Sequence, residues 1–272
     1  MKLGPIGKIF TLSAVVASAV GTAYATHAWG NYHWARTAPF SLALGDNVSG
    51  PWDAALASAN SDWMQSTVLN TYIVPGGAKP RNCRPTSGRV EVCNATYGQT
   101  GWLGIAQIWA TSSHITQGVV KLNDAYFNTP TYNTTAWRNL VTCQEVGHTF
   151  GLSHQDENFD NASLGTCMDY TSNPEPNQHP NRHDYEMLES IYSHLDSTTT
   201  VDSTSAAQLP AEMKGRDFDR QSSWGQLKKR SREGAREIYV RDFGNGHQLV
   251  THVFWALAEG GPAHRQQRAN EE

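Results

Sequence analysis

Residues 144–154 have the sequence QEVGHTFGLSH, and this stretch decides the fold. Four of its residues have the spacing E-x-x-H-x-x-G-x-x-H: Glu145, His148, Gly151 and His154. On a helix, Gln144 and His148 stand at i and i+4, so both side chains project from one face and can reach one metal ion. Glu145 follows directly and lies beside that face, where a general base for a water molecule is needed.

The same stretch predicts where its helix ends. Apolar residues at helical spacing predict a helix from about residue 134 or 135 to residue 150. Gly151 then ends it, because glycine adopts the left-handed conformation without a Cβ penalty. The chain can therefore turn back and bring His154 to the same metal ion as a further ligand.

This motif resembles the signature of the metzincins, a family of zinc peptidases with H-E-x-x-H-x-x-G-x-x-H and a methionine in a tight turn further along. Residues 167–170, CMDY, resemble that Met-turn, and the predicted helix from residue 182 resembles the closing helix of the family. The resemblance covers about residues 38–195. It implies an α+β fold of the zincin type, with a twisted mixed sheet, an active-site helix, a Met-turn and a C-terminal helix.

Gln144 departs from the family pattern, because it stands where the first zinc-binding histidine belongs. An amide oxygen is a harder and weaker donor than imidazole toward zinc. Three alternatives follow: Gln144 is the first ligand, His114 or His179 takes that place, or the site holds no zinc. We favour a retained metal, because a carboxylate at Glu145 is costly to bury without a compensating charge.

The resemblance implies a secreted endopeptidase in which zinc activates a water molecule and Glu145 acts as general base. Tyr170 matches a position where some metzincins have a tyrosine that contacts zinc or supports the oxyanion, and packing in the core is the alternative. The predicted ligands of zinc are His148, His154 and Gln144, and the predicted partner is a protein or peptide substrate. The alternative function is a catalytically inactive metzincin-like binding module that has lost or weakened its zinc site.

Periodicity along the chain predicts the remaining elements of the α+β domain. Strands are expected at residues 40–48, 68–74, 88–93 and 103–109, with a further candidate at 118–123, and helices at 51–63 and 182–195. Strand 118–123 is expected at an edge of the sheet, where Lys121 would discourage pairing with another chain. Asn181 is expected to cap the last helix.

Composition predicts four segments. Residues 1–25 are typical of a signal peptide cleaved after Ala25, residues 26–195 form the catalytic domain, and Ser- and Thr-rich residues 196–211 form a linker. Residues 212–272 form a polar tail with a hairpin around Gly244, to which no activity is assigned.

The four cysteines of an exported chain predict two disulfides, and local pairing favours Cys83–Cys93 and Cys143–Cys167. The formal charge of −4 gives no broad reason to expect nucleic acid as a partner. Nothing after the signal peptide is apolar enough to predict a membrane-spanning segment.

Overall fold

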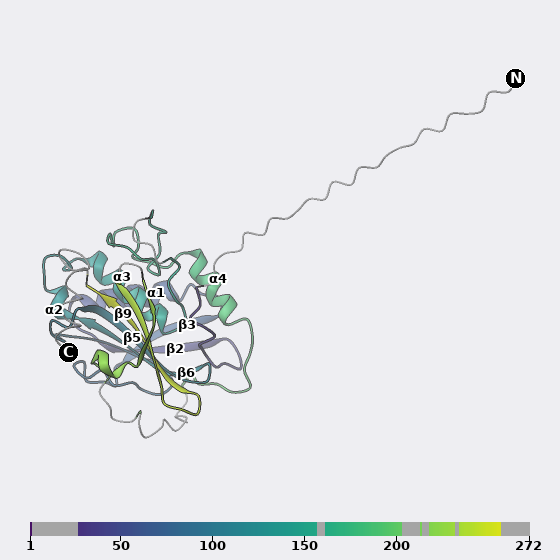
Figure 1. Cartoon of the computed structure of the whole chain (residues 1–272), viewed down its shortest axis with the longest axis horizontal. Helices are drawn as coiled ribbons and strands as arrows, with labels where there is room; N and C mark the ends of the chain where they lie inside the picture. The colour runs from purple at the N-terminus through teal and green to yellow at the C-terminus, as the bar shows by residue number, and fades with distance from the viewer. Residues whose placement is uncertain (2–26, 157–160, 203–212, 214–217, 232–233, 257–272) are drawn as a thin grey trace.

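The fold combines one large mixed sheet with a few helices (Figure 1). It is taken from a computed structural model that describes residue 1 and residues 27–156, 161–202, 213, 218–231 and 234–256. The predicted α+β class is confirmed at this level. The predicted signal peptide lies outside the described residues, apart from Met1.

The described strands form a single nine-stranded sheet. The strands are β1 (His33–Trp34), β2 (Phe40–Asn47), β3 (Leu69–Pro75), β4 (Val90–Ala95), β5 (Trp102–Thr111), β6 (His114–Asn123), β7 (Gln226–Arg230), β8 (Arg236–Asp242) and β9 (His247–Trp255). Their order is β3-β2-β4-β6-β5-β9-β8-β7, and β1 pairs with β6. Strands β2, β3, β4 and β6 pair in parallel, whereas β5, β9, β8 and β7 pair antiparallel to their neighbours.

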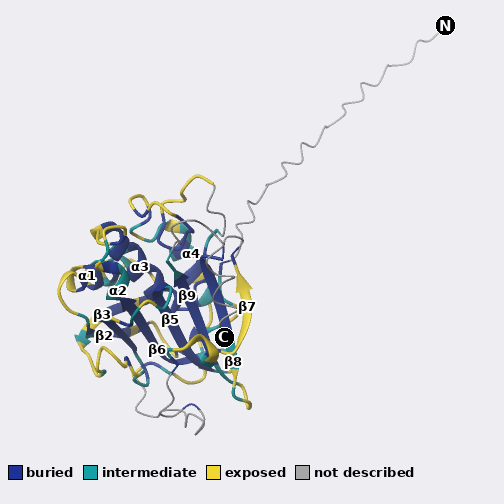
Figure 2. Cartoon of the chain, turned by 60° about the vertical axis from the view of Figure 1, so that its left-hand side comes forward, coloured by how far each residue is buried: buried dark blue, intermediate teal, exposed yellow. Residues whose placement is uncertain are grey.

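Strand β6 lies inside the sheet, between β4 and β5, so the prediction of an edge strand at residues 118–123 is wrong. Lys121 is buried and pairs with Asp219, which compensates its charge. Strand β7 is at one end of the order and is exposed along its whole length (Figure 2). Its sequence QLKKR provides the charged side chains that protect an edge from pairing with other chains.

The helices are α1 (Pro51–Trp63), α2 (Asp124–Phe127), α3 (Thr135–His148) and α4 (Arg182–Ile191), with one 3-10 turn, η1 (Gln221–Ser223). Helix α1 begins at a proline, which suits the first helical position, and its apolar side packs into the main core with α3 and the sheet. Helix α4 has the predicted Asn181 cap, completed by Asp184 as a capping box. It ends at Ile191, about one turn before the predicted end at residue 195.

Helix α3 is the most deeply buried helix of the fold, because almost every residue from Ala136 to His148 lies inside. The Thr134 hydroxyl accepts a hydrogen bond from Trp137 N at 3.2 Å and caps its first turn. At its other end, Trp63 of α1 donates from Nε1 to the Cys143 carbonyl at 3.2 Å. These contacts fix the helix that carries the sequence motif.

The C-terminal strands β8 and β9 belong to the same sheet as the rest of the domain. Strand β9 pairs with β5 along nearly its whole length, and Val250 and Phe254 enter the main core. The predicted hairpin is present, with Gly244 in its turn. Residues 196–202 of the predicted linker are also joined to the domain, since Asp196 N donates to Arg36 O at 2.7 Å. The division into catalytic domain, linker and tail stays a prediction.

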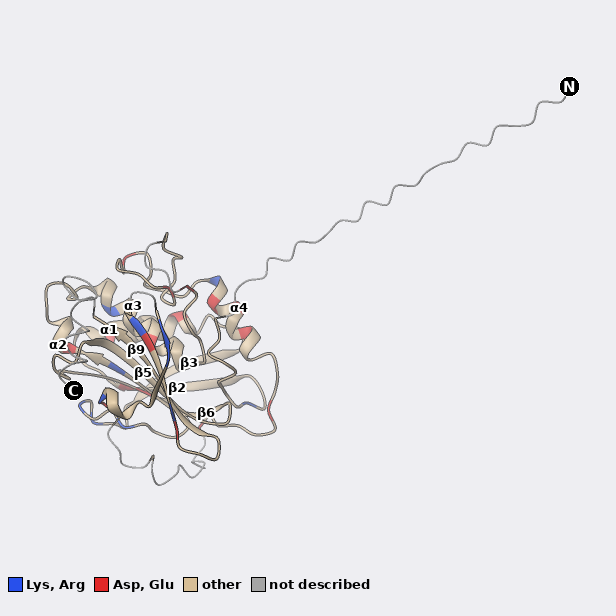
Figure 3. Cartoon of the chain, viewed as in Figure 1, with Lys and Arg blue, Asp and Glu red and all other residues tan. Residues whose placement is uncertain are grey.

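Both predicted disulfides are confirmed, with Cα–Cα distances of 6.0 Å for Cys83–Cys93 and 5.9 Å for Cys143–Cys167. The second one joins α3 to the segment of Met168. Acidic and basic residues are distributed over several elements (Figure 3). Among the described residues, no helix has the length and apolar character needed to cross a bilayer.

Candidate metal centre on helix α3

The turn after α3 brings His154 back to His148. Gly151 has φ +95°, and a Cβ there would lie 2.1 Å from the Tyr32 carbonyl oxygen, so only glycine fits. His148 Nδ1 donates to the Leu152 carbonyl at 2.9 Å, and His148 Nε2 lies 3.0 Å from His154 Nε2. The structure therefore brings together the two histidines that the sequence predicted as ligands.

The hydrogen bond to Leu152 decides which nitrogen of His148 is free. A carbonyl oxygen only accepts, so Nδ1 carries the proton and the neutral ring presents the lone pair of Nε2 to His154. Two ligands of a tetrahedral zinc ion, with bonds of about 2.0–2.1 Å, lie about 3.3 Å apart. The observed 3.0 Å between the two Nε2 atoms is close to that spacing, and without an ion it is the length of a hydrogen bond from His154 Nε2 to His148 Nε2.

A third imidazole, that of His252 on β9, lies beside this pair of histidines. Its ring stacks on His148 with centroids 4.0 Å apart, and its centroid is 6.5 Å from that of His154. Both ring nitrogens of His252 are buried and have no hydrogen-bond partner among the described residues. Buried polar atoms without a partner are rare in native proteins and need an explanation such as an ion.

The register of the sheet explains how His252 reaches α3. His252 lies opposite Ala106 of β5, and Phe254 lies opposite Gly104. Side chains at these paired positions share a face of the sheet. The small residues Gly104 and Ala106 leave space on that face, into which His252 projects beneath α3.

Glu145 occupies the same space from the helix side. A Cβ at Gly104 would lie 2.9 Å from Glu145 Cγ, so the glutamate packs directly on β5. Glu145 Oε2 is buried without a hydrogen-bond partner among the described residues. Burial raises the pKa of Glu145 to about 8, although the charge of Arg236 and the amide of Ala106 act in the opposite direction. A group with such a pKa can exchange a proton near neutral pH.

Burial also keeps the histidines of the cluster neutral. It lowers the pKa of His148 to about 3 and lowers the pKa values of His154 and His252 well below the usual value. Neutral imidazole is the form that binds metal ions. Neutral rings with unpartnered nitrogens are the donor type that zinc prefers, and the His252 ring has to turn from its stacked position on His148 before one of its nitrogens reaches an ion held by His148 and His154.

Gln144 lies beside this cluster with both ends of its amide in hydrogen bonds. Its Nε2 donates to the Cys167 carbonyl at 2.6 Å, and its Oε1 accepts from Arg236 Nε at 3.0 Å. The two alternative ligands considered from the sequence have other partners: His114 Nε2 lies 3.3 Å from Asp196 Oδ1, and His179 Nδ1 lies 2.8 Å from Asp62 Oδ2.

The predicted Met-turn and its tyrosine also lie at the cluster. Met168 is buried, and a Cβ added at Gly147 of α3 would lie 2.8 Å from its Sδ, so turn and helix are in close contact. The Tyr170 ring is 4.4 Å from the His154 ring, and the Arg236 guanidinium lies 5.4 Å from the centre of the Tyr170 ring.

Sequence reasoning missed His252 and Arg236, because both lie on strands of the segment interpreted as a tail without activity. One signal was available. In β9, Val250, His252 and Phe254 alternate with residues of the other face, so a histidine stands in the middle of an apolar core face. Arg236 gives no comparable signal, since an arginine at the start of a polar strand is usually exposed.

No family model matches this chain, and no curated protein matches it. Among solved structures, that of myroilysin is similar with a TM-score of 0.33 and 12% sequence identity, over 61% of this chain and 87% of that chain. A likeness of this size carries no argument about the fold or function of the chain, which rest on the residues themselves.

Proposed function

We propose that this chain is a secreted zinc-dependent endopeptidase whose ion is held by His148, His154 and His252. One observation carries the proposal: the Nε2 atoms of His148 and His154 face each other at 3.0 Å, and beside them both ring nitrogens of His252 are buried without a hydrogen-bond partner among the described residues. Ligation by His252 requires its ring to turn from its stacked position on His148. The two disulfides support an oxidising compartment.

Zinc, when bound, supplies Lewis-acid activation of a water molecule and of a peptide carbonyl. Glu145 accepts a proton from the water at Oε2, which has no other partner among the described residues, and donates it to the leaving amine. Burial raises the pKa of Glu145 to about 8 in the chain without an ion, and the charge of bound zinc would lower it, which favours the carboxylate that accepts the proton. Arg236 lowers the cost of the carboxylate form through its charge.

Two neighbouring residues have supporting roles in this proposal. Tyr170, packed on the His154 ring, is placed to support the oxyanion or to hold that ring in orientation. Gln144 fixes the Arg236 guanidinium through its Oε1 and joins α3 to the turn at Cys167. Gln144 remains the alternative to His252 as the third ligand, and the zinc affinities of variants at these two positions separate them.

Burial of the site favours one second candidate, a metal-binding module without catalysis. Glu145, His148 and His252 are each 1% exposed, so a peptide reaches them only if the covering strands or side chains move. Zinc binding and peptide cleavage are therefore separable properties of this site.

The test uses the full chain, stripped of metal with a chelator and then supplied with zinc, and measures cleavage of an unstructured protein. We expect cleavage to disappear with the metal and return with zinc. It should be lost in Glu145→Gln but kept in Glu186→Gln, which changes a partly exposed glutamate of α4. Zinc binding at the ligands named here without any cleavage establishes the second candidate. A chain that binds no zinc at these ligands overturns both.

A further inference from the structure

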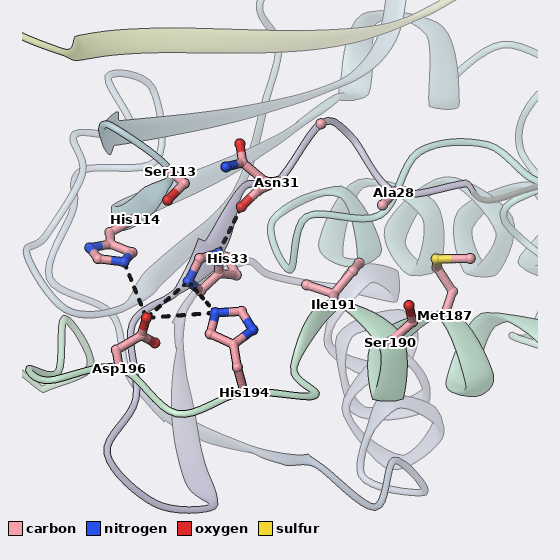
Figure 4. Close-up of a pocket in the computed structure, with 11 residues that line it drawn as sticks. Ala28, Asn31, His33, Ser113, His114, Met187, Ser190, Ile191, His194 and Asp196 are labelled. Atoms are coloured by element: carbon pink, nitrogen blue, oxygen red, sulfur yellow. Dashed lines mark hydrogen bonds and ion pairs between the residues drawn. The ribbon is translucent and has the colours of Figure 1, made fainter.

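A second cluster of histidines lies outside the α3 site and shares no residue with it (Figure 4). His33 comes from β1, His114 from the start of β6, and His194 and Asp196 from the segment after α4. Ligand atoms of His33, His114 and Asp196 all lie within 4.8 Å of one another. The histidines surround the carboxylate of Asp196 rather than pointing into solvent separately (Figure 4).

Four distances within this cluster are close to the edge length of a coordination tetrahedron around zinc. Asp196 Oδ1 lies 3.4 Å from His33 Nε2, 3.3 Å from His114 Nε2 and 3.6 Å from His194 Nε2. His194 Nε2 is also 3.3 Å from His33 Nε2. Ligands bound tetrahedrally at about 2.0–2.1 Å are about 3.3 Å apart, so each of these four distances is close to an edge of such a shell, and His194 stands next to two of its members.

Hydrogen bonds around the cluster leave lone pairs directed inward. His33 Nδ1 donates to the Asn31 carbonyl at 2.7 Å, so the neutral ring has a bare Nε2 facing Asp196 and His194. Asp196 Oδ2 accepts from Arg36 N at 2.9 Å, which orients the carboxylate and leaves Oδ1 toward the histidines. A bare nitrogen beside a carboxylate oxygen is repulsive unless a proton or a cation lies between them. Such outer partners commonly orient the ligands of metal sites.

We propose that His33, His114, His194 and Asp196 bind a second zinc ion with a structural role. Four protein ligands complete a tetrahedral shell and leave no open position for a substrate, which is typical of structural zinc sites. The cluster borders a pocket of about 680 Å³, also lined by Met187 and Ile191, through which an ion can enter.

The position of the site indicates what the ion stabilises. It joins the segment of β1 to the residues after α4, which are far apart in the sequence. Residues next to β1 contact the turn after α3: Trp29 N donates to Gly151 O at 2.8 Å, and Ala28 forms a bridge with Leu152. Zinc in the second cluster therefore holds the segment that supports the turn between His148 and His154.

The test measures zinc per full-length chain after dialysis against low free zinc, in the wild type and in variants of each cluster. We expect His194→Ala and Asp196→Asn each to bind one equivalent fewer than the wild type, or to bind it roughly tenfold or more weakly. His194 is half-exposed, and the amide oxygen introduced by Asp196→Asn can still accept from Arg36 N, so both variants should fold. His179→Ala, which removes an exposed histidine, is the control and should change nothing.

Cobalt substitution adds a readout that does not depend on activity. In the double variant His148→Ala and His154→Ala, we expect one cobalt ion with the intense visible absorption of a tetrahedral site, lost again when His194→Ala is added. Zinc content that does not fall in the variants of His194 and Asp196, in chains with wild-type circular dichroism, overturns the proposal. Because the readout is made without the α3 ligands, failure of the peptidase proposal leaves this result unchanged.

Discussion

The two histidine clusters of this chain differ in burial and in charge. On α3, His148, His154 and His252 are almost completely buried, and among the described residues no carboxylate oxygen is hydrogen-bonded to their rings. In the second cluster, Asp196 lies between three imidazoles, and His194 is half-exposed. Neutral ligands leave the double charge of zinc unbalanced, which favours Lewis acidity, whereas an anionic fourth ligand and a closed shell favour stability. Under the two proposals, the chain uses the same ligand type for chemistry in one cluster and for structure in the other.

The largest expected effect is on the rate of peptide cleavage, which a variant of the α3 cluster should lose and a variant of the second cluster should keep. His154→Ala removes a ligand of the α3 site and should reduce cleavage to background, because zinc contributes several kcal/mol of transition-state stabilisation. Asp196→Asn should keep the chemistry and lower the thermal midpoint instead. Initial rates on an unstructured protein, measured beside melting curves, check this pair. Equal loss of activity in both variants at a temperature where both are folded would remove the distinction.

The two disulfides can be compared by what their removal does to the free energy of unfolding and to zinc affinity. Replacing Cys143 and Cys167 together by alanine should destabilise the chain by about 3 kcal/mol, because the bridge closes the loop from α3 to the Met168 turn. Replacing Cys83 and Cys93, which close a shorter loop far from α3 in the sequence, should cost about as much stability but leave zinc affinity unchanged. Denaturant unfolding and zinc titration of both variants test this. Unchanged zinc affinity without Cys143–Cys167 would contradict a role of the bridge in positioning α3.

Gly151, in the turn after α3, contacts the segment just before β1 through Trp29 and Tyr32. Gly151→Ala should cost about 2–3 kcal/mol, since it combines a left-handed backbone with displacement of the Tyr32 carbonyl. Gly244→Ala is the matched control: it also has positive φ, but nothing lies within 4 Å of its Cβ, so about 1 kcal/mol is expected. Chemical denaturation measures both. A cost at Gly151 no greater than that at Gly244 would show that the contact with Tyr32 is easily displaced.

The smallest expected effect is on zinc affinity, and it tests whether His252 or Gln144 is the third ligand at α3. His252→Ala should weaken zinc binding at that site by roughly 10- to 100-fold, whereas Gln144→Met, of similar volume, should change it less than about threefold. Competition with a chromophoric chelator, in chains that carry His194→Ala to silence the second cluster, measures both affinities. The reverse order of effects would assign the position to Gln144.

The sequence predicted those parts of the structure that depend on short spacing. The helix and turn that bring His148 to His154 follow from the position of Gly151, and both disulfides follow from local pairing. In the same way, the capping box at Asn181 depends on residues only three apart. Local physical chemistry determines each of these features.

Features that depend on distant pairing could not be predicted in this way. His252 reaches α3 only because β9 pairs with β5, and no local pattern specifies that partner or its register. The edge prediction for Lys121 failed for the same reason, since the burial of its strand is set by neighbours and by Asp219. The second cluster combines His33 with Asp196 across the chain, and single histidines in separate segments give no spacing to recognise.

The central claim is that three histidines, His148, His154 and His252, hold a zinc ion beside Glu145. Anomalous diffraction at the zinc edge from crystals of the full chain tests it most directly. At α3 we expect a peak bonded to Nε2 of His148 and His154 and to a ring nitrogen of His252, with Gln144 still hydrogen-bonded to Arg236. A peak bonded to Gln144 Oε1, or no peak at α3 in crystals grown with zinc, would contradict the claim.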